Sequence, residues 1–136
     1  MHLRIVAGPH VLRARLETGL APKTCEYFRS LLPYRQKIIH VRWSGEACWI
    51  PLGALATGLG FENATSYPAP GQILFYPGGY SETEMLLAYG SVCFASKLGQ
   101  LAGNHFMTVT DGLELLAPLG HLTLWQGAQD IVFEPA

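Results

Sequence analysis

The stretch Ala21-Pro22-Lys23-Thr24-Cys25-Glu26-Tyr27-Phe28 decides the fold, because it gives the clearest helix start in the sequence. Pro22 suits a first helical turn, where the missing N–H of proline costs nothing. Pro33 predicts the end of the helix, since the residue before a proline avoids helical backbone angles. Thr24 and Phe28 begin an apolar face that continues one turn later at two leucines. The spacing predicts a short helix lying over a core.

Strand-like segments lie on both sides of this helix. Val11–Leu16 alternates apolar and polar residues, and with His2–Val6 it predicts an antiparallel hairpin around Gly8-Pro9. Further strands are predicted at Lys37–Trp43, Glu46–Pro51, Gln72–Tyr76, Glu84–Tyr89, His105–Thr110, His121–Trp125 and Asp130–Glu134. A second short helix is predicted at Leu113–Leu119, ended by Pro118 and Gly120. This content predicts an α+β fold, mainly β, with a sheet curled or closed into a barrel.

Several segments carry a resemblance to known proteins. Ala21–Phe28 resembles the APKTxENF helix start of cyclophilins, Gly103–Val109 is similar to their GSQFFI strand, and Asp111–Leu116 resembles their second helix. The whole chain is similar to an uncharacterised bacterial family of cyclophilin-like domains of unknown function. The segments that carry this similarity are His40–Ala47, Tyr76–Gly79, Ser81–Glu84 and Gly103–Phe106. The resemblance implies a closed eight-stranded barrel with a short helix covering each end, and it implies no assigned chemistry.

Length and composition limit the classes of protein to consider. A chain of 136 residues is the size of a single domain, 1–136. With 49% hydrophobic and only 14% charged residues, we expect apolar surface to be covered by a second copy, giving a homo-oligomer. The nine Lys and Arg residues are scattered, which argues against nucleic-acid binding. Prolines interrupt the uncharged stretches, and no basic-then-apolar leader begins the chain, so we expect a cytoplasmic protein without membrane contact.

Cysteine and histidine spacing gives no sign of a metal or cofactor. Cys25, Cys48 and Cys93 are widely separated and form no C-x-x-C pair. We expect three reduced thiols, mostly buried as small apolar side chains. No H-x-H or H-E-x-x-H spacing occurs, so neither a metal site nor a cofactor is predicted.

The segment around Ser44-Gly45 supplies the first candidate site. If these two residues form a tight hairpin loop, His40 lies opposite Trp49, and Arg42 shares their face of the sheet. Arginine can stack on an indole and still offer a planar pair of donors to a carboxylate or carbonyl. Arg42 is therefore the first catalytic candidate, with His40 and Trp49 as ligand-binding residues. The alternative is an outward arginine in a surface ion pair.

A second group of candidates lies near residue 105. Strand alternation places His105 and Met107 on one face, with Phe106 and Thr108 on the other. The resemblance implies that the first two line a pocket. His105 is thus the second catalytic candidate, as a donor or a base, and Met107 a ligand-binding residue. The alternative is a partly buried histidine paired with a backbone carbonyl.

The glycine-containing loop Tyr76–Glu82 is expected to expose Tyr80, Ser81 and Glu82 at a pocket rim, with Tyr80 and Glu82 as ligand-binding candidates. It matches neither phosphate-binding glycine motif, and the alternative is an ordinary turn with polar tips. Glu82 and Glu84 are two residues apart and share a face if the segment is a strand. Paired carboxylates suit acid–base catalysis, but a solvated strand edge is the simpler interpretation.

Three functions are consistent with these residues. The first is binding, with or without conversion, of a small anionic or carbonyl-containing ligand at an Arg/Trp/His pocket. The second is prolyl cis-trans isomerisation or binding of proline peptides, which the cyclophilin resemblance implies. Against it, Val109 runs almost directly into the second helix, where cyclophilins place a further pocket wall. The third is a non-catalytic, self-associating subunit of a metabolic enzyme, suggested by the low charge.

Overall fold

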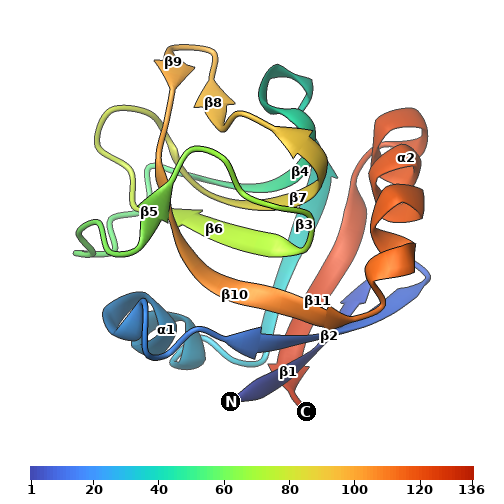
Figure 1. Ribbon diagram of the computed structural model, residues 1–136, viewed down its shortest axis with the longest axis horizontal. Coiled ribbons are helices and arrows are strands. Elements are labelled where there is room, and N and C mark those ends of the chain that lie inside the picture. The colour runs from blue at the N-terminus through green and yellow to red at the C-terminus, as the bar shows by residue number, and fades with distance from the viewer.

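Eight antiparallel strands close into a barrel in the computed structural model, which describes residues 1–136 (Figure 1). The order around the barrel is β2-β1-β11-β3-β4-β7-β6-β10, and pairing of β10 with β2 closes it. The strands are β1 (His2–Ala7), β2 (His10–Leu16), β3 (Tyr34–His40), β4 (Gly45–Gly53), β6 (Gln72–Tyr76), β7 (Thr83–Val92), β10 (Gly103–Asp111) and β11 (Gln129–Pro135). The predicted barrel is confirmed.

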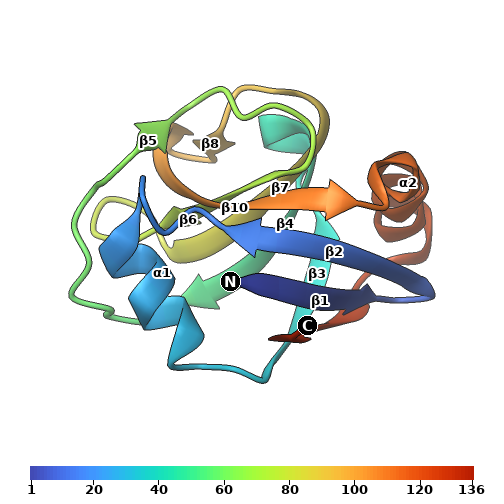
Figure 2. The same cartoon turned by 60° about the horizontal axis from the view of Figure 1, so that its bottom comes forward.

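Two helices lie at opposite ends of this barrel, α1 (Pro22–Arg29) and α2 (Leu116–Gln126) (Figure 2). A single 3-10 turn, η2 (Leu113–Leu115), leads into α2. Helix α1 begins at Pro22 as predicted, but it ends at Arg29, four residues before Pro33. Phe28 from its apolar face packs edge-on against Phe106 and Phe133 inside the barrel.

The strand predicted at His121–Trp125 is wrong, because these residues form the second half of α2. Pro118 does not end the helix. It lies in the first turn, where the missing N–H removes no hydrogen bond. Gly120 does not end the helix either. A glycine is needed there because a Cβ at this position would lie 2.5 Å from the ring of Tyr89.

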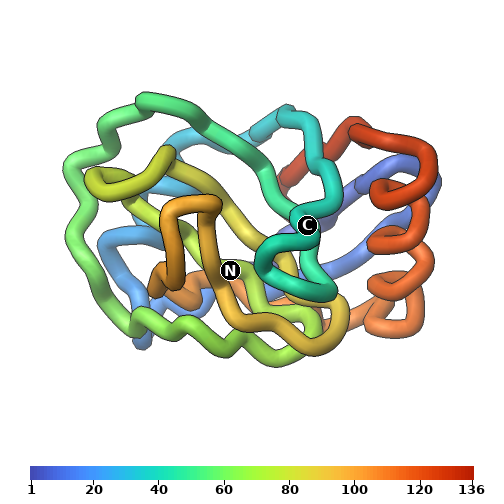
Figure 3. The backbone as a smooth tube through the Cα atoms, turned by 90° about the horizontal axis from the view of Figure 1, so that it is seen from above, coloured from blue at the N-terminus to red at the C-terminus, as the bar shows by residue number.

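Two segments outside the barrel wall form its upper side. The long connection 54–71 carries the short strand β5 (Ala64–Thr65), which pairs with β10. The strands β8 (Ala95–Ser96) and β9 (Gly99–Gln100) form a small separate hairpin. Figure 3 shows the connection (green) running around the periphery of this hairpin (orange). Both segments therefore lie over the same part of the barrel.

Strands β6 and β7 are buried on both faces. Phe75, Met85 and Leu87 belong to the main core inside the barrel. Leu74 and Leu86 belong to a second, smaller cluster on the outer face. That cluster is completed by Val41, Ala47, Tyr76, Phe94 and Leu101. The hairpin region covers what would otherwise be an exposed apolar surface of the sheet.

The predicted hairpin at Ser44-Gly45 is wrong by one residue. A 3-10 turn, η1 (Arg42–Ser44), separates β3 from β4, and the register pairs Ile39 with Trp49 and His40 with Cys48. A shift of one residue moves every side chain of a strand to the other face. The expectation that His40, Arg42 and Trp49 share a face is therefore also wrong.

A β-bulge changes the faces of β10. The register shifts between His105 and Met107, so that Phe106 and Met107 are both fully buried in the core. The expectation that His105 and Met107 share a face is wrong for this reason. His105 points outward with Thr108, and their side chains are 2.7 Å apart. A bulge inserts one extra residue and breaks the strict alternation of a strand.

Candidate functional site

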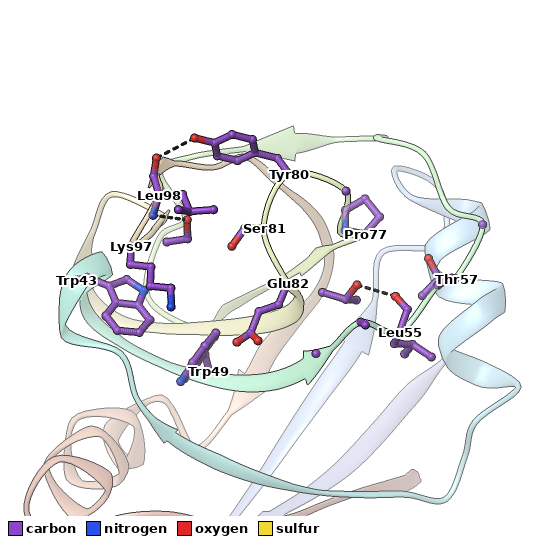
Figure 4. Close-up of a pocket in the computed structure, with 17 residues that line it drawn as sticks. Trp43, Trp49, Leu55, Thr57, Pro77, Tyr80, Ser81, Glu82, Lys97 and Leu98 are labelled. Carbon is purple, nitrogen blue, oxygen red and sulfur yellow. Dashed lines mark hydrogen bonds between the residues drawn. The ribbon is translucent and has the colours of Figure 1, made fainter.

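A cavity of about 920 Å³ lies on the outer side of the barrel, between β4, the loop after β6 and the β8–β9 hairpin (Figure 4). It is large enough for a small organic molecule. Of the seven predicted site residues, Trp49, Tyr80 and Glu82 line it. The other lining residues are Trp43, Gly53, Ala54, Leu55, Ala56, Thr57, Gly58, Pro77, Gly79, Ser81, Thr83, Ser96, Lys97 and Leu98.

Two tryptophans form one wall of this cavity. Trp43 from η1 and Trp49 from β4 pack edge to face, with ring centroids 5.5 Å apart and an interplanar angle of 76°. Trp43 remains half exposed. Ser44 holds the turn in place, because its hydroxyl donates to the carbonyl of Ala95 and accepts from the N–H of the same residue. The wall is thus fixed to the hairpin.

The opposite wall is the loop Pro77–Thr83, which hydrogen bonds fix on two sides. The hydroxyl of Tyr80 donates to the carbonyl of Leu98 across the cavity mouth at 2.9 Å. The hydroxyl of Thr83 donates to the carbonyl of Leu55 at 2.7 Å. These bonds join the loop to the hairpin and to the 54–58 segment, so three separate segments form one rim.

One side chain of each charge lines the cavity, Lys97 and Glu82, and both are exposed. Figure 4 shows both reaching toward the tryptophan wall. An ammonium group beside two indoles can bind the anionic part of a ligand while the rings contact its apolar part. Sequence reasoning did not select Lys97, Leu98 or Trp43. For Lys97 and Leu98 the sequence did contain a signal, because both lie in a turn immediately before Gly99. For Trp43 it contained none.

Glu84 follows the rim residue Thr83 but is fully buried. Neither of its carboxyl oxygens has a hydrogen-bond partner. It pairs in register with Tyr76 on one side and Pro51 on the other. Burial, with the nearby charge of Glu82, raises the pKa of Glu84 to about 8. The expectation that Glu82 and Glu84 form a solvated edge is therefore wrong for Glu84.

His40 and Arg42 lie away from the cavity. They line a separate groove against α2, together with Tyr89 and His121. Burial lowers the pKa of His40, and the charges of Arg42 and His121 lower it further.

His105 lines neither the cavity nor the groove. It lies in a chain of polar side chains in which the hydroxyl of Thr108 donates to Glu17 at 2.6 Å and is 2.7 Å from Nε2 of His105. Burial lowers the pKa of His105, and Glu17 opposes that effect. The carboxylate of Glu17 can only accept, so the hydroxyl proton of Thr108 is donated to it. His105 is therefore placed to donate from Nε2 to the hydroxyl oxygen of Thr108.

Two of the three cysteines are unsuited to nucleophilic chemistry, because they are buried and their thiols stay protonated. Cys25 and Cys48 are buried, and burial raises the pKa of both thiols to about 11. Cys93 is exposed. No group of three or more His, Cys, Asp or Glu side chains is placed to hold a metal ion. No helix has the length and apolar character needed to cross a membrane.

The comparison with protein families assigns the chain to a family. The model of the family described as "Protein of unknown function (DUF3830)" matches residues 5–134. The chain belongs to this family. No curated protein matches the sequence of this DUF3830 domain.

Solved structures similar to the DUF3830 domain share its barrel. McbB in complex with tryptophan matches with a TM-score of 0.72 and 16% identity over 97% of this chain, which spans 44% of the McbB chain. A hypothetical protein from Archaeoglobus fulgidus matches with a TM-score of 0.67 and 17% identity, over 100% of this chain and 95% of that chain. A cyclophilin-type peptidyl-prolyl cis-trans isomerase from Cryptosporidium parvum, solved with the dipeptide Ala-Pro, matches at 0.62 and 19% over both whole chains. The predicted cyclophilin-like fold is confirmed.

Proposed function

We propose that this domain binds a small molecule that has a flat apolar part and a carboxylate or carbonyl group, in the cavity between Trp49 and the Tyr80 loop. The observation that carries the proposal is the pair of indoles, Trp43 and Trp49, set edge to face at the side of a cavity of about 920 Å³. Aromatic walls bury flat ligands at little cost in side-chain entropy, because the rings are already held in place.

Lys97 supplies the charge that favours an anionic or carbonyl group at the same end of the cavity. The hydroxyls of Thr57 and Ser81 add neutral hydrogen-bonding groups to the lining. Polar groups that orient a ligand beside apolar walls are typical of small-molecule sites. The ligand in the McbB structure, tryptophan, combines a flat ring with a carboxylate, which makes indole carboxylates suitable first probes.

Prolyl isomerisation is the weaker candidate. It relies on an arginine beside an apolar proline socket, and the lining of this cavity contains no arginine. Arg42 lies one residue from Trp43, but it lines the groove against α2 instead. We expect no rate above background in a protease-coupled prolyl peptide assay. A rate that disappears in a Trp49→Ala variant would favour isomerisation over the present proposal.

The proposal is tested by calorimetric titration of indole-3-acetate and indole-3-carboxylate into the wild type and matched variants. We expect Trp49→Leu and Lys97→Gln each to weaken binding by roughly tenfold, the effect of losing one good contact. Tyr67→Leu and Lys23→Gln remove an exposed aromatic ring and an exposed lysine outside the cavity and should leave the affinity unchanged. Binding that is absent in the wild type, or equal in Trp49→Leu and Tyr67→Leu, would contradict the proposal.

A further inference from the structure

A second hollow lies on a different side of the barrel, where α2 stands alongside the ends of β3, β4 and β7 (Figure 1). It is a groove of about 450 Å³. Its lining residues are His40, Arg42, Gly45, Glu46, Tyr89, His121, Leu124 and Trp125. Five of these eight residues carry a titratable or charged side chain, which distinguishes the groove from the mainly uncharged cavity described above.

Tyr89 contacts residues on both walls of the groove. Its hydroxyl is 2.7 Å from Nε2 of His40. Its ring lies edge-on to two imidazoles, at 5.6 Å from His40 and 6.1 Å from His121. Gly120 of α2 makes room for the ring, since any Cβ there would come within 2.5 Å of it. The tyrosine is therefore held in one position by both walls.

The hydrogen bond between His40 and Tyr89 has a preferred direction. Nδ1 of His40 is buried and has no partner. Leaving an N–H donor buried and unpaired is the rarer and costlier arrangement, so Nδ1 is expected to carry no proton. Burial and the charge of Arg42 lower the pKa of His40, which keeps the ring neutral. The single proton then resides on Nε2 and is donated to the oxygen of Tyr89.

This direction leaves the hydroxyl proton of Tyr89 unused by His40, so that it can be donated to a molecule in the groove. Two further donors lie beside it, the exposed side chains of Arg42 and His121. The carboxylate in the lining, Glu46, is turned toward the backbone of β7, where Oε1 accepts the N–H of Ser91 at 2.9 Å. Gly90 provides the space for that turn.

We propose that this groove is a second ligand site, which binds a small oxyanion, a carboxylate or a phosphate ester, through Arg42, Tyr89 and His121. The guanidinium supplies a planar pair of donors, the phenol a third and the imidazole a fourth. Trp125, three-quarters exposed at the edge of the groove, offers a flat apolar surface to the organic part of the ligand. The site is separate from the cavity and does not depend on its function.

The test is a two-dimensional ¹H–¹⁵N titration with phenyl phosphate and with benzoate, followed at the indole N–H of Trp125. Inorganic phosphate and acetate are titrated in parallel, to separate the oxyanion from the aromatic part. We expect saturable shifts with the aromatic oxyanions. Arg42→Gln should weaken the affinity roughly tenfold and Tyr89→Phe severalfold. Arg35→Gln and Tyr67→Phe change exposed residues outside the groove and should leave the titration unchanged.

Equal weakening by Arg42→Gln and Arg35→Gln would overturn the proposal, because it would mean that only the overall charge matters. Absence of saturable shifts in the wild type would overturn it as well. Arg42 is exposed, so its variant tests the site without disturbing the core. A long-range ¹H–¹⁵N spectrum of the histidines adds an independent readout. A proton on Nε2 of His40 supports the donor assignment of Tyr89, and a proton on Nδ1 contradicts it.

Discussion

At the scale of single residues, Glu84 is the most unusual group in the molecule. A buried carboxyl without a hydrogen-bond partner is strongly disfavoured as an anion, so it keeps its proton. The pKa of Glu84 is raised to about 8 in the folded chain, while the unfolded chain has the ordinary value near 4.5. Above pH 4.5 the unfolded state releases a proton that the folded state retains. The free energy of unfolding must therefore fall as the pH rises from about 4.5 to about 8.

Glu84→Gln keeps the size of the side chain and removes its ionisation. We expect the variant to gain stability relative to the wild type as the pH rises, by roughly 3–5 kcal/mol across the window. Urea unfolding at pH 5.5 and pH 8.5 measures this difference. Glu114→Gln, which changes an exposed carboxylate elsewhere in the chain, is the control and should change little. A constant difference between Glu84→Gln and wild type at both pH values would show that Glu84 is ionised in the folded state.

Sequence reasoning reached the residues of the site unevenly, and the reason is local geometry. Tyr80 and Glu82 were found because a glycine-containing loop leaves its polar and aromatic residues exposed. Trp49 was found through a pairing that is wrong by one residue, and it lies in the cavity without His40 or Arg42. Met107 was placed on the wrong face because alternation cannot anticipate a bulge.

At the scale of elements, the turn between β3 and β4 separates the cavity from the groove, the two proposed ligand sites. Arg42 and Trp43 are neighbours in η1, yet the first lines the groove and the second lines the cavity. Gly45 ends the turn with φ of 108°, a conformation that other residues rarely adopt. A Cβ at this position would lie 2.6 Å from the carbonyl oxygen of Ser91. The turn that begins β4 therefore requires a glycine at position 45.

Gly45→Ala should destabilise the domain by about 1–3 kcal/mol, since it adds both backbone strain and a clash with backbone. The matched control is Gly19→Ala, because Gly19 has ordinary angles and open space around it. Chemical unfolding of both variants gives the comparison. Equal stability of the two variants would mean that the turn adapts to a side chain at position 45.

Helix α1 depends on a residue far from it in sequence. Its N-cap residue, Ala21, has no side chain that can cap the helix. Instead, Oε1 of Glu62 accepts two hydrogen bonds from Thr24, one from its backbone N–H at 2.6 Å and one from its side-chain hydroxyl at 2.8 Å. The APKT stretch predicted where the helix begins, but the cap comes from the 54–71 connection and could not be read from local sequence.

Glu62→Ala leaves both groups of Thr24 without this partner, and we expect it to cost about 1–2 kcal/mol of stability. Glu26→Ala changes an exposed glutamate within the helix and serves as the control. Thermal unfolding, with amide exchange at Thr24, reports the effect. Unchanged exchange at Thr24 in Glu62→Ala would contradict the capping role.

At the scale of the whole molecule, the barrel could be predicted and the cavity could not. Alternating segments and two short motifs specify strands and helices locally, and closure follows from burying them. The cavity is assembled from η1, β4, the 54–58 segment, the loop after β6 and the β8–β9 hairpin. Contacts between such distant segments, among them the bond from Tyr80 to Leu98, leave no periodic signal in the sequence.

The central claim is that small molecules bind at the tryptophan wall of the cavity. The chain has three tryptophans: Trp43 and Trp49 line the cavity, and Trp125 lines the groove. One ¹H–¹⁵N spectrum of the indole N–H groups, recorded during titration with indole-3-acetate, therefore tests it most directly. Binding in the cavity predicts saturable shifts of Trp43 and Trp49 with a common dissociation constant. Shifts of Trp125 alone, or of no indole at all, would contradict the claim.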